Sequence, residues 1–315
     1  MTQPNPTARP GRPSVWRTAL PRLALFLAIA ATLAGPVRAQ SQGERNPAPD
    51  ARLTYATLAD GAELQIWVYK PPGWSPSDRR AAILFFFGGG WSGGNPSQFA
   101  PHAKHFADRG MVAMAAEYRI RSKHNSTPID STKDARSAMR WVIAQAGELG
   151  VDPARIAAGG GSAGGHLAAT LPTIRDVNNA GDDLSIDPRP AALVLFNPAA
   201  NLTGDVADLS DPSRHRSGLT VAEFATIDPI RHLDARFPPC IVFHGTADET
   251  VTFDKAEAFV EAVNAAGGGP CRLVAFEGRG HGFFNSSRGA DDFGTTLRLS
   301  DDFLVEQGLL EPRAE

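Results

Sequence analysis

Short, almost wholly apolar runs alternate with helical patterns from Arg52 onward, and this alternation limits the possible folds more than any other feature. The runs RLTYATL and AELQIWVYK, separated by residues 59–61, predict an opening β-hairpin. Six later runs predict further strands: AAILFFF, MVAMAAEY, RIAAGG, AALVLFN, CIVFHG and CRLVAFEG. Helices are predicted over residues 98–109 and 131–149. Continuous apolar strands alternating with helices are typical of a mostly parallel sheet, so we expect a doubly wound α/β domain.

Composition narrows the class of function. The chain has 315 residues, 42% of them hydrophobic and 21% charged, which is enough to bury the core of one large α/β domain. The net charge of −3 and the absence of a Lys/Arg block give no reason to expect a nucleic-acid partner. No His/Cys/Asp spacing is typical of a zinc site, and we expect neither a metal nor a cofactor. A small or neutral substrate fits this composition better.

The first 39 residues differ in kind from the rest. The apolar run LALFLAIAATLAG covers residues 23–35, and Val37-Arg38-Ala39 supplies a small-x-small cleavage site. Four arginines precede the run: Arg9, Arg12, Arg17 and Arg22. This pattern predicts a secretory signal peptide, since the run is too short for a membrane span of about 20 apolar residues. We therefore expect cleavage near Ala39, export to the periplasm or medium without a stable membrane anchor, and a single catalytic domain over residues 40–315.

Two stretches interrupt the alternation of strands and helices. Residues 176–190 and 199–239 are rich in Asp, Pro, Ser and Gly. Excursions of this length between strands of a compact domain are usually functional or disordered. The longer one would lie above the carboxyl edge of the sheet, where ligands bind, so we predict a small lid-like insertion over the active site.

The segment RIAAGGGSAGGHLAA contains the pentad Gly160-Gly161-Ser162-Ala163-Gly164 between a predicted strand and a predicted helix. A serine on such a sharp strand-to-helix turn is exposed and strained, and small flanking residues let the strand and helix approach each other. The motif and its context together predict that Ser162 is a nucleophile.

A serine hydroxyl needs a base to remove its proton, and the base needs a third group to orient it. Asp248 follows the run CIVFHG and His281 follows CRLVAFEG, so both come shortly after predicted strands. The chain order Ser162, Asp248, His281 is that of α/β-hydrolases. Glu249 is the alternative for the acid.

The other histidines have less specific interpretations. His166 is expected to point along its helix, and His244 to make a structural hydrogen bond. Five lie in polar or amphipathic segments and are expected to be solvated: His102, His105, His124, His215 and His232.

The motifs FFFGGGWSGG, AGGGSAGGHLAA, FHGTADETVTF and EGRGHGFF resemble those of secreted α/β-hydrolase esterases related to the bacterial feruloyl and acetyl-xylan esterase group. They resemble hormone-sensitive-lipase-like esterases more distantly. The resemblance covers residues 64–304 and implies a triad of Ser162, Asp248 and His281. The chain departs from it at Phe87, where those esterases usually carry histidine, and it lacks the N-terminal cap helices of the lipase-like branch.

The glycine loop LFFFGGGWSGG is expected to hold the oxyanion of an acyl-transfer intermediate. The donors in such sites are backbone N–H groups, here of Ala163 and of one or both of Gly88 and Gly89. Because no side chain donates, Phe87 would support the loop by packing rather than take part in the chemistry.

These patterns predict a serine carboxylic-ester hydrolase that works through an acyl-enzyme, and the resemblance implies short-chain acyl esters of carbohydrates. A prolyl-oligopeptidase-like peptidase is one alternative. A noncatalytic secreted binding protein is another, because fold alone does not fix function.

Two cysteines, Cys240 and Cys271, open consecutive predicted strands. Adjacent strands lie about 4.8 Å apart, a separation that a disulfide can bridge. An exported protein meets oxidising conditions, so a bridge is one outcome and two small buried thiols are the other.

Overall fold

A computed structural model describes residues 46–203 and 219–313 of the protein. All of these residues belong to one compact unit, Ala39–Glu315. The predicted signal peptide with its cleavage site, His215 and the middle of the predicted insertion lie outside the described residues.

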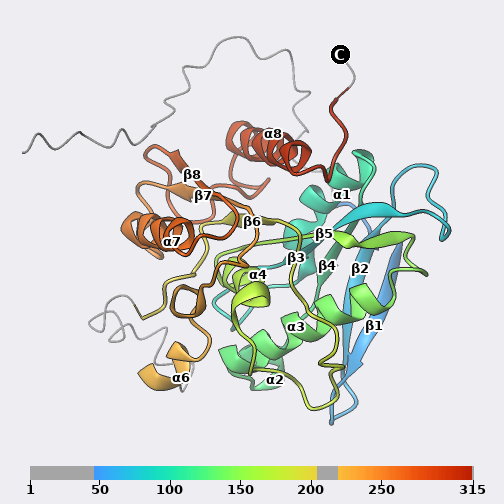
Figure 1. The fold of residues 1–315 in the computed structure, drawn as a ribbon, viewed down its shortest axis with the longest axis horizontal. Coiled ribbons are helices and arrows are strands. Elements are labelled where there is room, and N and C mark those ends of the chain that lie inside the picture. Colours follow the sequence, from blue (N-terminus) through green and yellow to red (C-terminus); the bar gives the residue numbers. More distant parts are fainter. Residues whose placement is uncertain (1–45, 204–218, 314–315) are drawn as a thin grey trace, which may run out of the picture. The chain divides into compact units, whose positions relative to one another are not determined.

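An eight-stranded sheet with the order β1-β2-β4-β3-β5-β6-β7-β8 forms the centre of this unit (Figure 1). The strands are β1 (Ala51–Thr57), β2 (Glu63–Tyr69), β3 (Arg80–Phe86), β4 (Val112–Ala116), β5 (Val151–Gly161), β6 (Leu193–Phe196), β7 (Cys240–Gly245) and β8 (Cys271–Phe276). β1 and β2 form the predicted antiparallel hairpin, and β2 pairs antiparallel with β4. All pairs from β4 to β8 are parallel. The predicted mostly parallel α/β sheet is confirmed.

Helices cover both faces of the sheet, with α1 and α8 on one side and α3 and α4 on the other (Figure 1). The helices are η1 (Pro96–Phe99), α1 (Ala100–Asp108), α2 (Arg121–His124), α3 (Pro128–Ala144), α4 (Ala163–Thr173), α6 (Val221–Ala225), η3 (Pro229–His232), α7 (Phe253–Ala265) and α8 (Ala290–Glu306). The prediction for α3 was wrong at both ends. The helix begins at Pro128, three residues before the predicted start, and Thr127 caps it through a capping box with Asp130. The chain leaves the helix after Ala144 and reaches Gly150, whose φ of +65° favours glycine.

The core contains His102, which was predicted from the sequence to be solvated. His102 is fully buried, and its ring centroid lies within 6.0 Å of those of Phe85, Phe99, Phe196, Phe284 and Phe293. It shares a helix face with Ala103 and Phe106, and that face packs on the sheet. Neither ring nitrogen of His102 has a hydrogen-bond partner among the described residues.

The expectation of solvation was also wrong for two of the other histidines. His105 Nε2 lies 3.0 Å from the buried carboxylate of Asp301. His124 Nδ1 accepts a hydrogen bond from the Ile120 amide at 3.0 Å, and its Nε2 is buried. His232 is exposed, as expected.

The described part of the predicted insertion packs against the domain. Phe224 and Ile227 form a small apolar cluster with Ala199, Leu202 and Val251. Buried Asp228 accepts hydrogen bonds from the backbone amides of residues 202 and 203. Whether this segment acts as a lid stays a prediction.

A disulfide joins Cys240 and Cys271, which are partners in the register between β7 and β8 with their Cα atoms 4.5 Å apart. Of the two outcomes that the sequence left open, the structure therefore has the bridge. No helix within residues 46–203 and 219–313 is long and apolar enough to cross a membrane.

Candidate active site

Ser162 occupies the sharp turn between β5 and α4, at the carboxyl end of the parallel strands. Its φ of +55° and ψ of −120° are strained for a residue with a side chain. The flanking glycines make the turn possible, because a Cβ on Gly164 would lie 2.0 Å from the Phe86 carbonyl oxygen, and one on Gly160 2.5 Å from the Gly164 backbone. The turn therefore presents the Ser162 hydroxyl at the carboxyl edge of the sheet.

His281 lies between Ser162 and Asp248 and contacts both. Its Nε2 is 2.9 Å from Ser162 Oγ, and its Nδ1 is 2.8 Å from Asp248 Oδ2. The loops after β7 and β8 carry the aspartate and the histidine, as the sequence predicts, and adjacent parallel strands bring their ends together. This arrangement lets the imidazole take a proton from the hydroxyl while the carboxylate orients it.

Asp248 is buried, and several donors surround its carboxylate. Oδ1 accepts hydrogen bonds from the amides of Thr250 and Val251 at 2.9 and 3.0 Å, and His244 Nε2 lies 3.4 Å from Oδ2. Burial by itself raises the pKa of Asp248, but hydrogen bonds from His244, His281 and Val251 outweigh it and hold the pKa well below its ordinary value. Glu249 is exposed and makes no such contact with the residues that the structure describes, so the geometry favours Asp248 as the acid.

The histidines flanking the triad hold the surrounding backbone. His244 Nε2 lies 2.8 Å from the Val251 carbonyl oxygen, which fits the structural hydrogen bond expected for it. His166 is buried within α4, with Nε2 2.7 Å from the Ile227 carbonyl oxygen and Nδ1 accepting from Trp91 Nε1 at 3.3 Å. Neither residue contacts the Ser162 hydroxyl through a hydrogen bond in the described structure.

The glycine loop lies beside Ser162, but one of its two predicted donors is already engaged. A Cβ on Gly88 would come 3.4 Å from the Ser162 Cβ. The Gly88 amide donates to Gln98 Oε1 at 2.6 Å, so it is not available to an oxyanion. No hydrogen bond engages the amides of Gly89 and Ala163 in the described residues. Of the predicted donors Gly88, Gly89 and Ala163, the geometry therefore favours Gly89 and Ala163 as the candidate oxyanion donors.

Phe87 supports the glycine loop through packing. Its ring is buried and stacks on Tyr118 with centroids 4.1 Å apart, and the Tyr118 hydroxyl donates to the Phe87 carbonyl oxygen at 2.6 Å. Gly94 closes over the ring, since a Cβ there would lie 2.7 Å from Phe87 Cδ2. The side chain thus holds the loop through apolar contact, as the sequence analysis expects.

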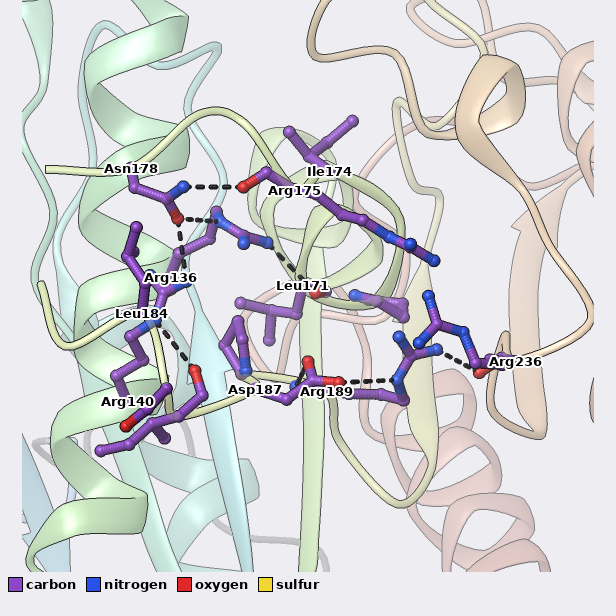
Figure 2. A pocket seen from close by; sticks show the side chains of 14 residues that line it. Arg136, Arg140, Leu171, Ile174, Arg175, Asn178, Leu184, Asp187, Arg189 and Arg236 are labelled. Atoms are coloured by element: carbon purple, nitrogen blue, oxygen red, sulfur yellow. Dashed lines mark hydrogen bonds and ion pairs between the residues drawn. The ribbon is translucent and has the colours of Figure 1, made fainter.

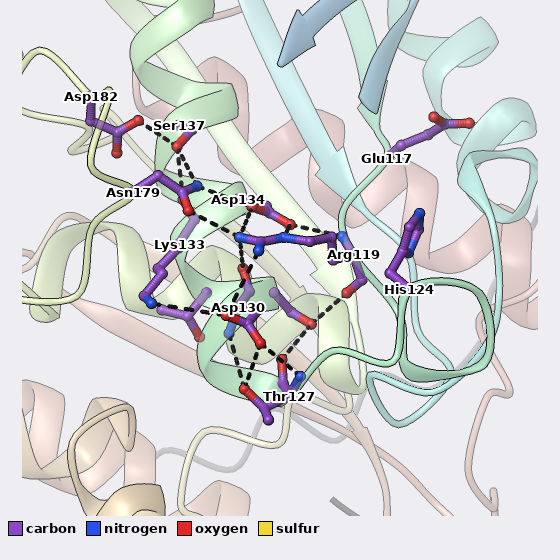
Figure 3. A network of polar contacts seen from close by, with 12 residues as sticks. Glu117, Arg119, His124, Thr127, Asp130, Lys133, Asp134, Ser137, Asn179 and Asp182 are labelled. Atoms are coloured by element: carbon purple, nitrogen blue, oxygen red, sulfur yellow. Dashed lines mark hydrogen bonds and ion pairs between the residues drawn. The ribbon is translucent and has the colours of Figure 1, made fainter. Parts of the chain in front are cut away.

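An ion pair anchors the segment that carries Tyr118 (Figure 3). The next residue, Arg119, donates to both carboxylate oxygens of buried Asp134 on α3, at 2.7 and 2.6 Å. Asn179 bridges the pair, accepting from Arg119 and donating to Asp134, each at 3.0 Å. This network fixes the backbone next to Tyr118 and, through Tyr118, the glycine loop.

Two amide side chains in the site, those of Gln98 and Asn285, were not identified from the sequence, and they link two of its loops. Gln98 Nε2 donates to Asn285 Oδ1 at 3.0 Å, and Asn285 Nδ2 donates to the Gly282 carbonyl oxygen at 2.7 Å. Together with the bond from Gly88, this chain connects the glycine loop to the loop of His281. The only sequence signal is the position of Asn285, four residues after His281 in EGRGHGFFN.

Asn197 is a further residue that the sequence analysis missed. It follows β6, is fully buried and has a φ of +35°. Its Oδ1 accepts from the Gly282 amide at 3.1 Å, and its Nδ2 lies 3.5 Å from His281 Nε2. A strained, buried asparagine beside the imidazole is typical of a residue that positions a functional group.

A cavity of about 440 Å³ opens next to His281. Its lining includes Arg279, Phe283 and Arg288, together with residues 289–292. Arg279 forms an ion pair with Asp292 at 2.6 Å. The candidate site therefore adjoins a space lined by charged and polar groups.

Comparisons with known proteins indicate an α/β-hydrolase esterase. The BD-FAE family model matches residues 68–263. The apo form of Thermogutta terrifontis esterase 2 is 44% identical in sequence, with a TM-score of 0.78 over 87% of this chain and 100% of that chain. The same esterase bound to propionate is 47% identical, with a TM-score of 0.78 over 84% of this chain and 96% of that chain. These solved structures show the α/β-hydrolase fold.

Curated relatives are more distant. The probable carboxylic ester hydrolase LipM of Mycobacterium tuberculosis is 28% identical over 85% of this chain and 62% of its own length. Esterase LipC of the same organism is 27% identical over 70% of this chain and 56% of its own length. The chain thus spans about three fifths of the length of these relatives.

Proposed function

The chain belongs to the BD-FAE family, and from this premise we propose that it hydrolyses carboxylic esters through an acyl-enzyme on Ser162. The contact of His281 with both Ser162 and Asp248 is the observation that carries the proposal. Esterases among its structural neighbours, at 44 to 47% identity, support the same reaction.

The proposed reaction gives each group a role. His281 Nε2 takes the Ser162 proton as Oγ attacks the ester carbonyl carbon, and Asp248 orients the imidazole. The carbonyl oxygen becomes an oxyanion held by the amides of Gly89 and Ala163. His281 then passes the proton to the leaving alcohol, and water, deprotonated by His281, releases the acid and restores Ser162.

A short acyl group and a polyhydroxylated alcohol are the substrate that we propose. The neighbouring esterase has been solved with propionate and with butyrate bound, which favours short acyl chains. The cavity beside His281 contains Arg279, Arg288 and Asp291, which suit hydroxyl groups better than an apolar alcohol. The resemblance to acetyl-xylan and feruloyl esterases points the same way.

Three substrates test this proposal on one purified preparation: a short-chain aryl ester, an acetylated xylan and a peptide anilide. We expect turnover of both esters and none of the anilide. Preferential cleavage of the anilide would show a peptidase, and no turnover of any of the three would support a noncatalytic binding protein. Release of acetate from xylan tests the carbohydrate substrate separately.

Export is a separate proposal that rests on the first 39 residues. Mass spectrometry of the protein recovered from the medium or periplasm of an expressing bacterium should show a new N-terminus close to residue 40. Recovery of the full-length chain in the cytoplasm alone would contradict it.

A further inference from the structure

A second cleft, of about 270 Å³, lies at the edge of the sheet opposite the candidate active site. Arg189 and Arg236 line it, and each comes four residues before a parallel strand, β6 at Leu193 and β7 at Cys240. Ser162, by contrast, follows the carboxyl end of β5. Because parallel strands share their direction, the cleft lies at their amino ends and is separate from the triad.

Five arginines from different segments line this cleft: Arg136, Arg140, Arg175, Arg189 and Arg236 (Figure 2). Three carboxylates lie at ion-pair distance from them. Asp182 pairs with Arg140 at 2.8 Å, Asp187 with Arg189 at 3.4 Å, and Asp234 with both Arg175 and Arg236. The guanidinium groups of Arg175, Arg189 and Arg236 gather on one side of the cleft (Figure 2).

Arg136 has no carboxylate partner within the described ranges. Its side chain is buried, and the residue is 3% exposed. It donates only to neutral acceptors, namely Asn178 Oδ1 at 3.1 Å and the carbonyl oxygens of Thr170 and Leu171 at 3.4 and 3.2 Å. Those carbonyls lie near the C-terminal end of α4, where the helix dipole offsets part of the charge.

The positive charge at Arg136 persists in spite of this burial. Burial, and then the charge of Arg140, lower the pKa of Arg136 to about 10, so the group is still a cation at neutral pH. The negative charges of Asp182, Asp187 and Asp176 act in the opposite direction, but none of these carboxylates forms an ion pair with Arg136 in the described structure. A buried cation without a directly paired opposite charge is unfavourable. Arg136 and Arg140 both donate to Asn178 Oδ1 and so hold the segment after α4. The amide oxygen of Asn178 carries no negative charge, however.

We propose that this cleft binds a doubly charged oxyanion of the phosphate or sulfate type. Counting only groups at ion-pair distance, five guanidinium groups exceed three carboxylates by two charges, and Arg136 is the one of the five with no carboxylate partner among the described residues. A dianion would offset this local excess. Planar guanidinium forks suit the oxygens of such ions and make strong charge-assisted hydrogen bonds to them. The ion would join α3, the segment after α4 and the segments that enter β6 and β7, and so stabilise the fold independently of catalysis.

Binding can be measured on the whole protein without an activity assay. The melting temperature is followed while sodium phosphate, sulfate or acetate replaces sodium chloride at constant ionic strength, and isothermal titration calorimetry gives the dissociation constant. We expect the melting temperature to rise saturably with phosphate and with sulfate, the calorimetric titration to fit a single site, and acetate to raise the melting temperature less. Arg136→Gln and Arg189→Gln should each raise the dissociation constant at least tenfold.

Arg272→Gln is the matched control, because Arg272 is an exposed arginine paired with Glu306 on another surface. It should bind phosphate as the wild type does. Arg189→Gln leaves the bonds of Arg136 to α4 in place, so it decides the question if Arg136→Gln does not fold. The proposal is overturned if the wild type shows no saturable response, if acetate acts as strongly as phosphate, or if Arg189→Gln binds with wild-type affinity.

Discussion

Gln98 and Asn285 form a direct side-chain hydrogen bond of 3.0 Å between segments 187 residues apart in the sequence. Gln98 also accepts from the Gly88 amide, and Asn285 donates to the Gly282 carbonyl oxygen. One pair of amides therefore sets the distance between the loop that is to hold the oxyanion and the loop that carries His281.

Gln98→Leu should lower kcat by roughly ten- to a hundredfold with little change in KM, because it releases the glycine loop from its fixed place beside Ser162. Asn285→Ala should have a similar effect, and the double variant should lose little more than either single one, since both break the same link. Active-site titration with paraoxon, which phosphorylates the neighbouring esterase, corrects each rate for the fraction of folded protein.

Gln307→Leu is the control for the Gln98 variant, because Gln307 lies after α8 and away from the site. Its kcat should match the wild type. If the losses for Gln98→Leu and Asn285→Ala multiply in the double variant, the two amides act separately and the link has no role of its own.

Phe87→His should keep kcat within about tenfold, a change of roughly 1.4 kcal/mol in the barrier, because the loop donates through backbone amides. Phe87→Ala should be less stable by about 3 to 5 kcal/mol, because it empties the space against Tyr118. Steady-state kinetics and urea unfolding measure the two effects. A thousandfold loss in Phe87→His at unchanged stability would show that the side chain takes part in the site.

Reduction of the Cys240–Cys271 disulfide should lower the free energy of unfolding by roughly 3 to 4 kcal/mol, because the bridge closes a loop with a sequence separation of 31 residues. Urea unfolding with and without a reductant measures this change. The double variant Cys240→Ala/Cys271→Ala should not respond to the reductant. Two free thiols titrated in the unfolded, unreduced protein would contradict the bridge.

His102→Leu should stabilise the protein, because it removes two buried ring nitrogens that lack partners. Burial, followed by the charge of His105, lowers the pKa of His102 from 6.5 to about 3. The unfolded state therefore binds a proton that the folded state does not as the pH falls below 6.5, and the wild type loses stability there.

The gain from His102→Leu should thus be larger at pH 5 than at pH 7, by about 2 kcal/mol. Urea unfolding at the two pH values tests this difference. His232→Leu, at an exposed histidine, serves as the control. An equal gain at both pH values would mean that His102 is not kept neutral by the fold.

The sequence predicts most of the fold because the buried parallel strands are continuous apolar runs, as in β3 and β4. The order of the strands was not predicted, because β4 lies between β2 and β3 and not after β3. The strand pattern places Ser162, Asp248 and His281 near one another, since each follows a strand end. Their catalytic roles and the lid-like role of residues 199–239 stay predictions.

The features that the sequence did not predict depend on contacts between distant segments. The burial of His102 follows from which face of α1 packs on the sheet, and polarity alone gave the wrong answer. The engagement of Gly88 requires Gln98 to turn back onto its own loop. Neither the partners of an amide side chain nor the end of α3 at Ala144 is specified by local residue pattern.

The catalytic role of Ser162 is the central claim, and ester turnover by Ser162→Ala tests it most directly. The variant should fold, with a melting temperature close to the wild type, and should lose several orders of magnitude in kcat, because only binding and oxyanion stabilisation are left. Retention of more than about a tenth of the wild-type kcat, a barrier change below roughly 1.4 kcal/mol, would contradict the acyl-enzyme mechanism on Ser162.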